Sequence, residues 1–187
     1  MPHIIDFDGL EQNLFILQHL TYGSKEFCTK NKINRDTEEF IDYEWWQYAG
    51  LLKSIASNTI IESAIKVRIL QDFVKKESND IDLTKLDNEA CSNLSIGTVS
   101  KGTFTLTLRE SCNKIVHATE AKMRWSNTSN SADAPEYWNG IYVLWGENRG
   151  QEWQVELNIE AWCIAMIRFN REIQEKVDWI HISKYDE

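Results

Sequence analysis

Apolar residues recur every three or four positions along several stretches of the chain, which is the period of an amphipathic helix. In residues 9–20 we therefore expect a first helix, with Leu10, Leu14, Leu17 and Leu20 on its apolar face. Residues 21–36 are polar and contain Gly23, so we expect them to form a loop.

Residues 38–77 have helical character throughout and contain no proline. The second half has two neighbouring apolar stripes. The first consists of Ile60, Ala64, Val67, Leu70 and Val74, and the second consists of Ile61, Ile65 and Ile69. Thr59-Ile-Ile-Glu62, which follows Ser57-Asn58, fits the capping-box pattern that begins a helix. One helix of about 40 residues would be unusually long. We favour two helices with a break near residue 57, and residues 83–94 allow a further short helix.

The pattern changes to strand-like alternation in the last third of the chain. Polar and apolar residues alternate in segments 122–126, 141–145 and 153–157, and Gly-Glu-Asn-Arg-Gly at 146–150 has the composition of a hairpin turn. Residues 127–136 have loop composition. Asn158 then caps a final helix with apolar residues at Ile159, Trp162, Cys163, Met166 and Ile167.

These elements predict a mainly α protein. We expect a bundle of four to six helices, with a small antiparallel β-hairpin or three-stranded sheet before the C-terminal helix. At 187 residues without internal repeats, the chain is expected to form a single domain over 1–187, in which about 121–157 is a β-hairpin elaboration.

Composition places the chain among globular proteins, with 42% hydrophobic residues and only two prolines, and excludes a disordered chain. The eight tryptophans favour an aromatic core over a base-stacking surface. The net charge of −9 argues against broad attraction to nucleic acid or anionic membranes. A local basic excess is nevertheless present in Lys101, Arg109, Lys114, Lys122 and Arg124.

Several classes of site lack sequence support. The cysteines at 28, 91, 112 and 163 form no CxxC pair or Cys/His cluster, so we expect neither a metal site nor a disulfide framework. We expect no cofactor, because no GxGxxG, P-loop or GxSxG motif occurs. No apolar run approaches the roughly 20 residues of a membrane helix, and no signal peptide is evident, so we expect a cytoplasmic protein that does not use a membrane.

Chemistry is most concentrated in residues 104–120, which we expect to form one amphipathic helix. Arg109, Asn113 and His117 follow one another at i, i+4 and i+8, so they point along one stripe of that helix. An arginine can neutralise phosphate charge, an amide can orient an imidazole, and an imidazole can transfer a proton near neutral pH. These three residues are the candidate catalytic set. The alternative is a polar helix edge, on which Glu110 and Lys114 form an ordinary i, i+4 pair.

The stretch Leu108-Arg-Glu-Ser-Cys-Asn-Lys-Ile-Val-His-Ala118 resembles the signature helix of the HEPN superfamily. Ribonucleases of that family carry an arginine, four to six further residues and then a histidine. Residues 62–70 are similar to the long helix that precedes the signature, and the resemblance covers about residues 43–120.

The resemblance implies an all-helical core that pairs as a homodimer, with two arginines and two histidines facing each other across a composite cleft. It implies metal-independent cleavage of RNA, with His117 as general acid/base, Arg109 stabilising phosphate charge and Asn113 orienting. Many family members act in toxin–antitoxin or phage-defence systems, so an antitoxin protein is an implied partner.

Other family members are inactive and serve only to dimerise or to bind a protein partner. Seven residues separate Arg109 from His117, and Cys112 stands where the compact motif carries arginine. The sequence therefore leaves two functions open: a homodimeric endoribonuclease and a non-catalytic dimerisation or protein-interaction module.

Overall fold

The structure is a computed structural model that describes residues 6–35, 44–78 and 80–179. Within these residues the chain forms five helices and four strands. In order they are α1 (Phe7–Lys30), α2 (Trp45–Glu77), α3 (Leu83–Ala90), β1 (Gly97–Lys101), α4 (Leu108–His117), β2 (Glu120–Asn127), β3 (Glu136–Asn148), β4 (Gln151–Asn158) and α5 (Ile159–Lys176).

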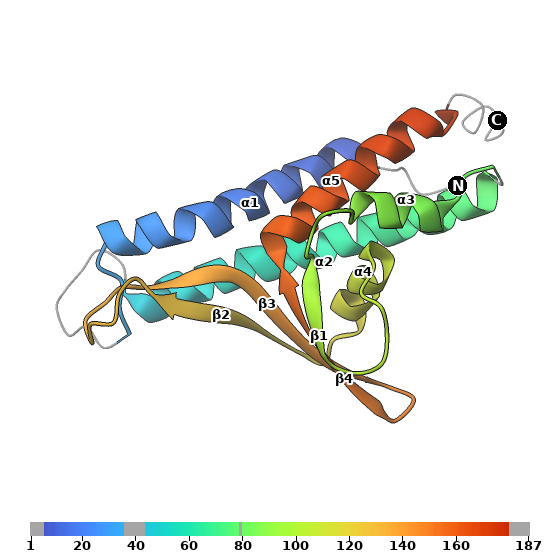
Figure 1. The fold of residues 1–187 in the computed structure, drawn as a ribbon. Helices are drawn as coiled ribbons and strands as arrows, with labels where there is room; N and C mark the ends of the chain where they lie inside the picture. The colour runs from blue at the N-terminus through green and yellow to red at the C-terminus, as the bar shows by residue number, and fades with distance from the viewer. Residues whose placement is uncertain (1–5, 36–43, 79, 180–187) are drawn as a thin grey trace.

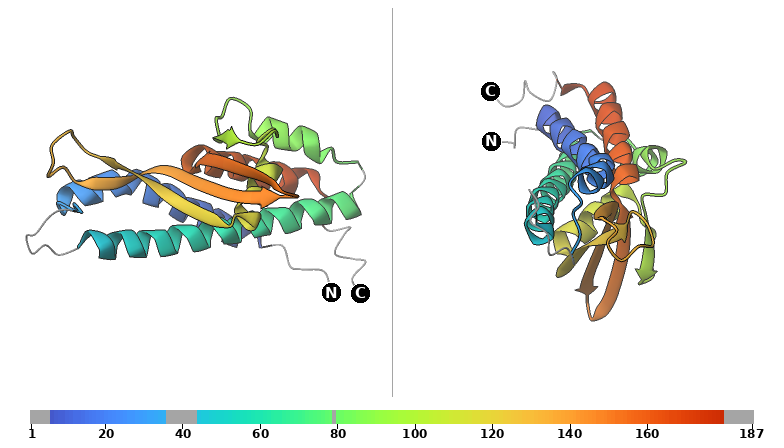
Figure 2. Two further views of the ribbon diagram at one scale, coloured as in Figure 1. Left: turned by 90° about the horizontal axis from the view of Figure 1, so that it is seen from below. Right: turned by 90° about the vertical axis from the view of Figure 1, so that its left-hand side faces the viewer.

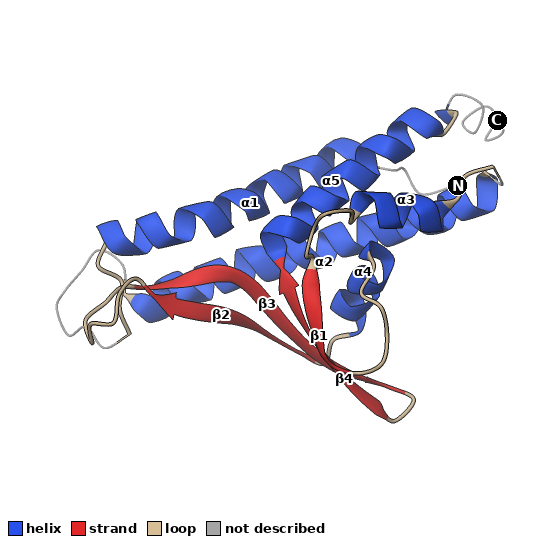
Figure 3. Ribbon diagram, viewed as in Figure 1, coloured by secondary structure: helices blue, strands red, loops and turns tan. Residues whose placement is uncertain are grey.

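The strands form one antiparallel sheet in the order β1-β4-β3-β2, and the helices lie over one of its faces (Figures 1 and 3). The right view of Figure 2 shows the helical layer and the sheet as two separate layers. Helix α4 lies between β1 and β2 in the chain, so it connects the two opposite edges of the sheet.

The prediction of a mainly α bundle with a hairpin or three-stranded sheet is wrong. The described residues are 57% helical and 21% strand, and the four-stranded sheet makes the fold α+β. The missed strand is β1, a five-residue segment whose first residue, Gly97, pairs with Leu157 of β4. Its pairing partner lies far along the chain, and local alternation is too short there to reveal it.

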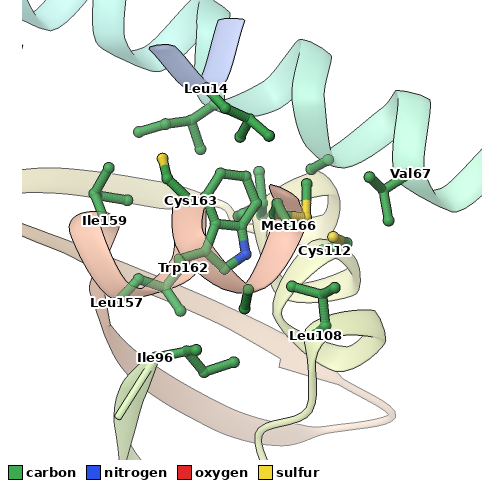
Figure 4. Close-up of a cluster of buried hydrophobic side chains, with 14 of the residues drawn as sticks. Leu14, Val67, Ile96, Leu108, Cys112, Leu157, Ile159, Trp162, Cys163 and Met166 are labelled. Atoms are coloured by element: carbon green, nitrogen blue, oxygen red, sulfur yellow. The ribbon is translucent and has the colours of Figure 1, made fainter. Parts of the chain in front are cut away.

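The sheet and the helices share one hydrophobic core. Trp162 of α5 belongs to this core, together with Leu14 of α1, Val67 of α2 and Leu157 of β4 (Figure 4). The Trp162 indole is fully buried and donates its Nε1–H to Ser111 Oγ on α4 over 2.8 Å. The sheet therefore contributes to the core itself and is more than an appendage to a helical bundle.

Two helices are longer than the sequence predicts. Helix α1 continues through most of the expected loop, because Ser24 and Cys28 pack inward on the same face as Leu17. Helix α2 runs without a break through residue 57, and the rest of the segment expected to be helical, 38–43, lies outside the described residues. The expected capping residue Thr59 donates its hydroxyl back to the Ile55 carbonyl over 2.7 Å, which is compatible with a helix interior.

The helix expected at 104–120 is shorter than predicted, since α4 spans Leu108–His117 and Glu120 begins β2. Other local predictions are confirmed: the short helix α3, the turn between β3 and β4, the loop before Glu136, and the Asn158 cap of α5, whose side chain accepts from Ala161 N.

Candidate functional site

The N-terminus of α4 is held in place by two side chains. Thr107 caps the helix by accepting from the Glu110 N–H over 3.2 Å. Asp87 of α3, only 5% exposed, accepts from the Leu108 N–H over 2.6 Å and from the Arg109 N–H over 2.9 Å. The first main-chain N–H groups of a helix have no partner within the helix, and here Thr107 and Asp87 provide those partners. The Asp87 carboxylate also neutralises the positive end of the α4 dipole.

Arg109 points from α4 to the C-terminal part of α2. Its guanidinium forms an ion pair with Asp72 over 2.6 Å and donates to Gln71 Oε1 over 3.2 Å. Partial burial disfavours the charged carboxylate of Asp72, but the hydrogen bond and charge of Arg109, together with the charge of Arg68, outweigh that effect and hold the pKa of Asp72 below its usual value. Arg109 is therefore already paired.

Asn113 belongs to the same network. Its Oδ1 accepts from Arg68 of α2, and its Nδ2 donates to Glu110 over 3.0 Å. Arg68 also reaches Asp72 over 3.4 Å. Arg68 therefore lies between α2 and α4, where it binds one of the three candidate residues.

His117 stands apart from the other two candidates. It is the exposed last residue of α4, and within the described residues its ring has no hydrogen-bond or ion-pair partner. Eight residues of helix separate its Cα from that of Arg109 by about 12 Å. The predicted stripe exists on α4, but one chain does not bring the imidazole and the Arg109 guanidinium together.

The local basic excess is neutralised. Each of its five cations forms an ion pair with a carboxylate: Lys101 with Glu152, Arg109 with Asp72, Lys114 with Glu110, Lys122 with Glu120 and Arg124 with Glu156. A phosphate-binding surface needs cations whose charge is available to the ligand. Each of these five cations therefore already has a carboxylate partner in the structure.

Lys114 is buried, although the sequence predicts an ordinary surface pair. Its Nζ lies 4.1 Å from the centre of the Phe104 ring and 4.6 Å from that of Trp153, besides contacting Glu110 over 3.1 Å. The side chain thus fastens α4 to β4 through cation–π contacts.

A cavity of about 510 Å³ opens beside Arg109. Gln71 and Lys75 of α2, Asp82 and Asp87 of the α3 region, and Arg109 are among its lining residues, and neither Asn113 nor His117 is. Its acidic members already accept main-chain amides at the starts of α3 and α4. The cavity does not join the three candidate residues into one site.

Helix α2 leaves several large apolar side chains exposed on the side that faces away from the core. We define the outer face of α2 by its exposed apolar residues: Leu51 54%, Ile55 47%, Ile61 41%, Ile65 41% and Ile69 38% exposed. In the left view of Figure 2, α2 runs along one side of the molecule. The second apolar stripe in the sequence, Ile61, Ile65 and Ile69, indicates this face. A helix that is apolar on two sides needs a partner on each side.

Comparison with protein-family models, with curated proteins and with solved structures finds no match to this chain. Within the described residues, no cluster of three or more His, Cys, Asp or Glu side chains is arranged to hold a metal ion. No helix in the described part of the chain combines the length and the apolar character required to cross a membrane.

Proposed function

We propose that this protein is a non-catalytic dimerisation and protein-interaction module that acts through the outer face of α2. The observation that carries the proposal is the row of large apolar side chains left exposed on that helix. Contiguous exposed apolar patches on soluble proteins mark interaction sites. The four free cysteines support a reducing compartment, the cytoplasm, for this activity.

The geometry of α4 also supports a non-catalytic role. A ribonuclease needs an arginine free to stabilise phosphate charge close to the proton-transferring histidine. Arg109 is engaged by Asp72 and lies about two helical turns from His117. The neighbouring cations are paired as well, so their charge offers little attraction to RNA.

A metal-independent endoribonuclease is the second candidate. It is favoured by one observation, the exposed His117 ring without a described partner, together with the likeness of Leu108–Ala118 to the HEPN signature. An available imidazole at a helix C-terminus can serve as a general acid or base.

Cleavage of labelled RNA in EDTA separates the two candidates. We expect no cleavage above buffer by the wild type, by His117→Ala or by His19→Ala. His19 is a matched control, because it is also exposed on a helix and hydrogen-bonds only its own helix, at the Phe15 carbonyl. Cleavage by wild type and His19→Ala that falls by about 100-fold or more in His117→Ala would overturn the module and establish the ribonuclease.

A further inference from the structure

The cavity beside Arg109 lies where three helices meet. Its volume is about 510 Å³, and α2, α3 and α4 all contribute to its wall, among them Gln71, Lys75, Leu83, Asp87 and Arg109. Ligand sites in proteins are cavities of roughly 300–1,000 Å³ with a few polar groups that orient the ligand. The space therefore suits a small molecule, and the hydrogen-bonding groups of the wall determine which kind.

Gln71 places a buried amide on this wall. It is 1% exposed, and Arg109 Nη1 donates to its Oε1 over 3.2 Å. Arginine has only donors, so the amide must turn its oxygen to Arg109 and its NH2 group the other way. Within the described residues that NH2 group donates to no acceptor. Buried polar groups in proteins are almost always hydrogen-bonded, so the unused donor indicates that the cavity receives an acceptor.

Two cations provide further donors beside this amide. Lys75 lies one helical turn after Gln71, so the two side chains project from the same side of α2. Its ammonium forms no ion pair within the described residues. Arg109 is held by Asp72 over 2.6 Å and by Gln71, and these contacts fix the orientation of both the guanidinium and the amide.

The acceptors of the cavity are mostly occupied. Both oxygens of Asp87 accept main-chain amides of α4, and Asp82 Oδ1 accepts two main-chain amides at the start of α3. The two carboxylates balance the charges of Lys75 and Arg109, so the wall is formally neutral while its unused groups are chiefly donors. A singly charged acceptor suits such a wall better than phosphate, whose second charge would lie close to Asp82 and Asp87.

Apolar side chains complete the wall. Ile81 and Leu83 line the cavity and pack, partly buried, against the core. We propose that the cavity binds a small monocarboxylic acid. Its carboxylate accepts from the Gln71 amide and the Lys75 ammonium, and its apolar portion lies against Ile81 and Leu83. Arg109 acts as a positioning residue that turns the Gln71 amide toward the ligand. This site is independent of the outer face of α2 and of the proposed function.

Titration of the ¹⁵N-labelled full chain with 3-phenylpropanoate, followed by NMR, tests the ligand class. We expect saturable shifts that include the Gln71 side-chain amide, with a Kd of about 1 mM for this ligand of about 11 non-hydrogen atoms. The neutral 3-phenylpropanamide keeps the apolar portion without the charge, and inorganic phosphate has charge without the apolar portion. Both should bind at least about ten-fold more weakly. Equal affinity for the acid and either of these two probes, or no saturation by the acid below about 20 mM, overturns the proposal.

Three variants locate the binding site. Lys75→Met keeps the length of the side chain and removes its charge, so it should weaken binding of 3-phenylpropanoate about ten-fold. Its circular dichroism should be unchanged because Lys75 is exposed. Lys85→Met is the matched control, since Lys85 is exposed on α3 but does not line the cavity, and it should bind like the wild type.

Gln71→Glu tests the amide itself. The new carboxylate can still accept from Arg109, but it has no donor for the ligand and repels its charge, so saturable binding should be lost. Equal effects of Lys75→Met and Lys85→Met, or wild-type affinity in Gln71→Glu, would show that the acid binds elsewhere and overturn the proposal.

Discussion

Asp87 positions the start of the helix that carries all three candidate residues. Its buried carboxylate accepts two main-chain amides of α4, so Asp87→Ala leaves both without partners. We expect the free energy of unfolding to fall by about 2–3 kcal/mol, as measured by urea denaturation followed by circular dichroism. Asp82→Ala removes the exposed cap of α3 and should cost only about 0.5–1 kcal/mol. Equal losses in the two variants would contradict the role assigned to Asp87.

The sequence predicts that Arg109, Asn113 and His117 share one helix, and α4 does carry all three. The sequence does not predict which residues these side chains contact. Arg109 contacts Asp72, 37 residues away, and Asn113 contacts Arg68, 45 residues away. Helical periodicity reports which residues share a face, but the groups that neutralise that face come from another element.

Among elements, α4 and the sheet are joined through Lys114. The side chain is 9% exposed, and its ammonium lies over two aromatic rings. Lys114→Met should therefore lose about 1 kcal/mol of unfolding free energy through the missing cation–π contacts. Lys114→Ala should lose about 2–3 kcal/mol, because its packed stem is also removed. Lys122→Ala is the control: Lys122 also lies over a tryptophan ring, that of Trp145, but its side chain is 65% exposed. We expect that change to stay within about 0.5 kcal/mol in thermal unfolding. A comparable loss there would show that burial of Lys114 is unimportant.

The length of α2 illustrates why element boundaries were harder to predict than element types. The capping-box pattern at 59–62 is a local signal, whereas the uninterrupted row of buried residues from Ala49 to Val74 depends on α1, α4 and the sheet packing along the helix. Packing outweighs the local signal here. Strand β1 is the opposite case, because its local pattern is weak and its pairing with β4 provides the structure.

For the whole molecule, the sequence predicted the order of most helices and the β3–β4 hairpin but assigned the wrong fold class. The sequence pattern presents the hairpin as an addition to a bundle, because its contribution to a shared core depends on contacts between distant segments. Trp138, Leu144 and Val155 of the sheet are as deeply buried as Leu14 and Ile60 of the helices. The second apolar stripe of α2 was visible in the sequence, but only the structure shows that the described residues leave it exposed.

One shared core should unfold as one unit, and the three buried free cysteines, Cys28, Cys112 and Cys163, can report it. Burial raises the pKa of the Cys112 thiol to about 12, and it also raises the pKa values of Cys28 on α1 and Cys163 on α5. At pH 8 these three thiols are therefore protonated and inaccessible to Ellman's reagent. With increasing urea the three should become reactive together, at the midpoint seen by circular dichroism. Cys91 is half-buried, and its pKa is raised to about 11 by burial and by Asp87, so it should react slowly before that transition. Labelling of Cys28 at a clearly lower urea concentration than Cys112 and Cys163 would instead divide the molecule into two units, with α1 outside the common core.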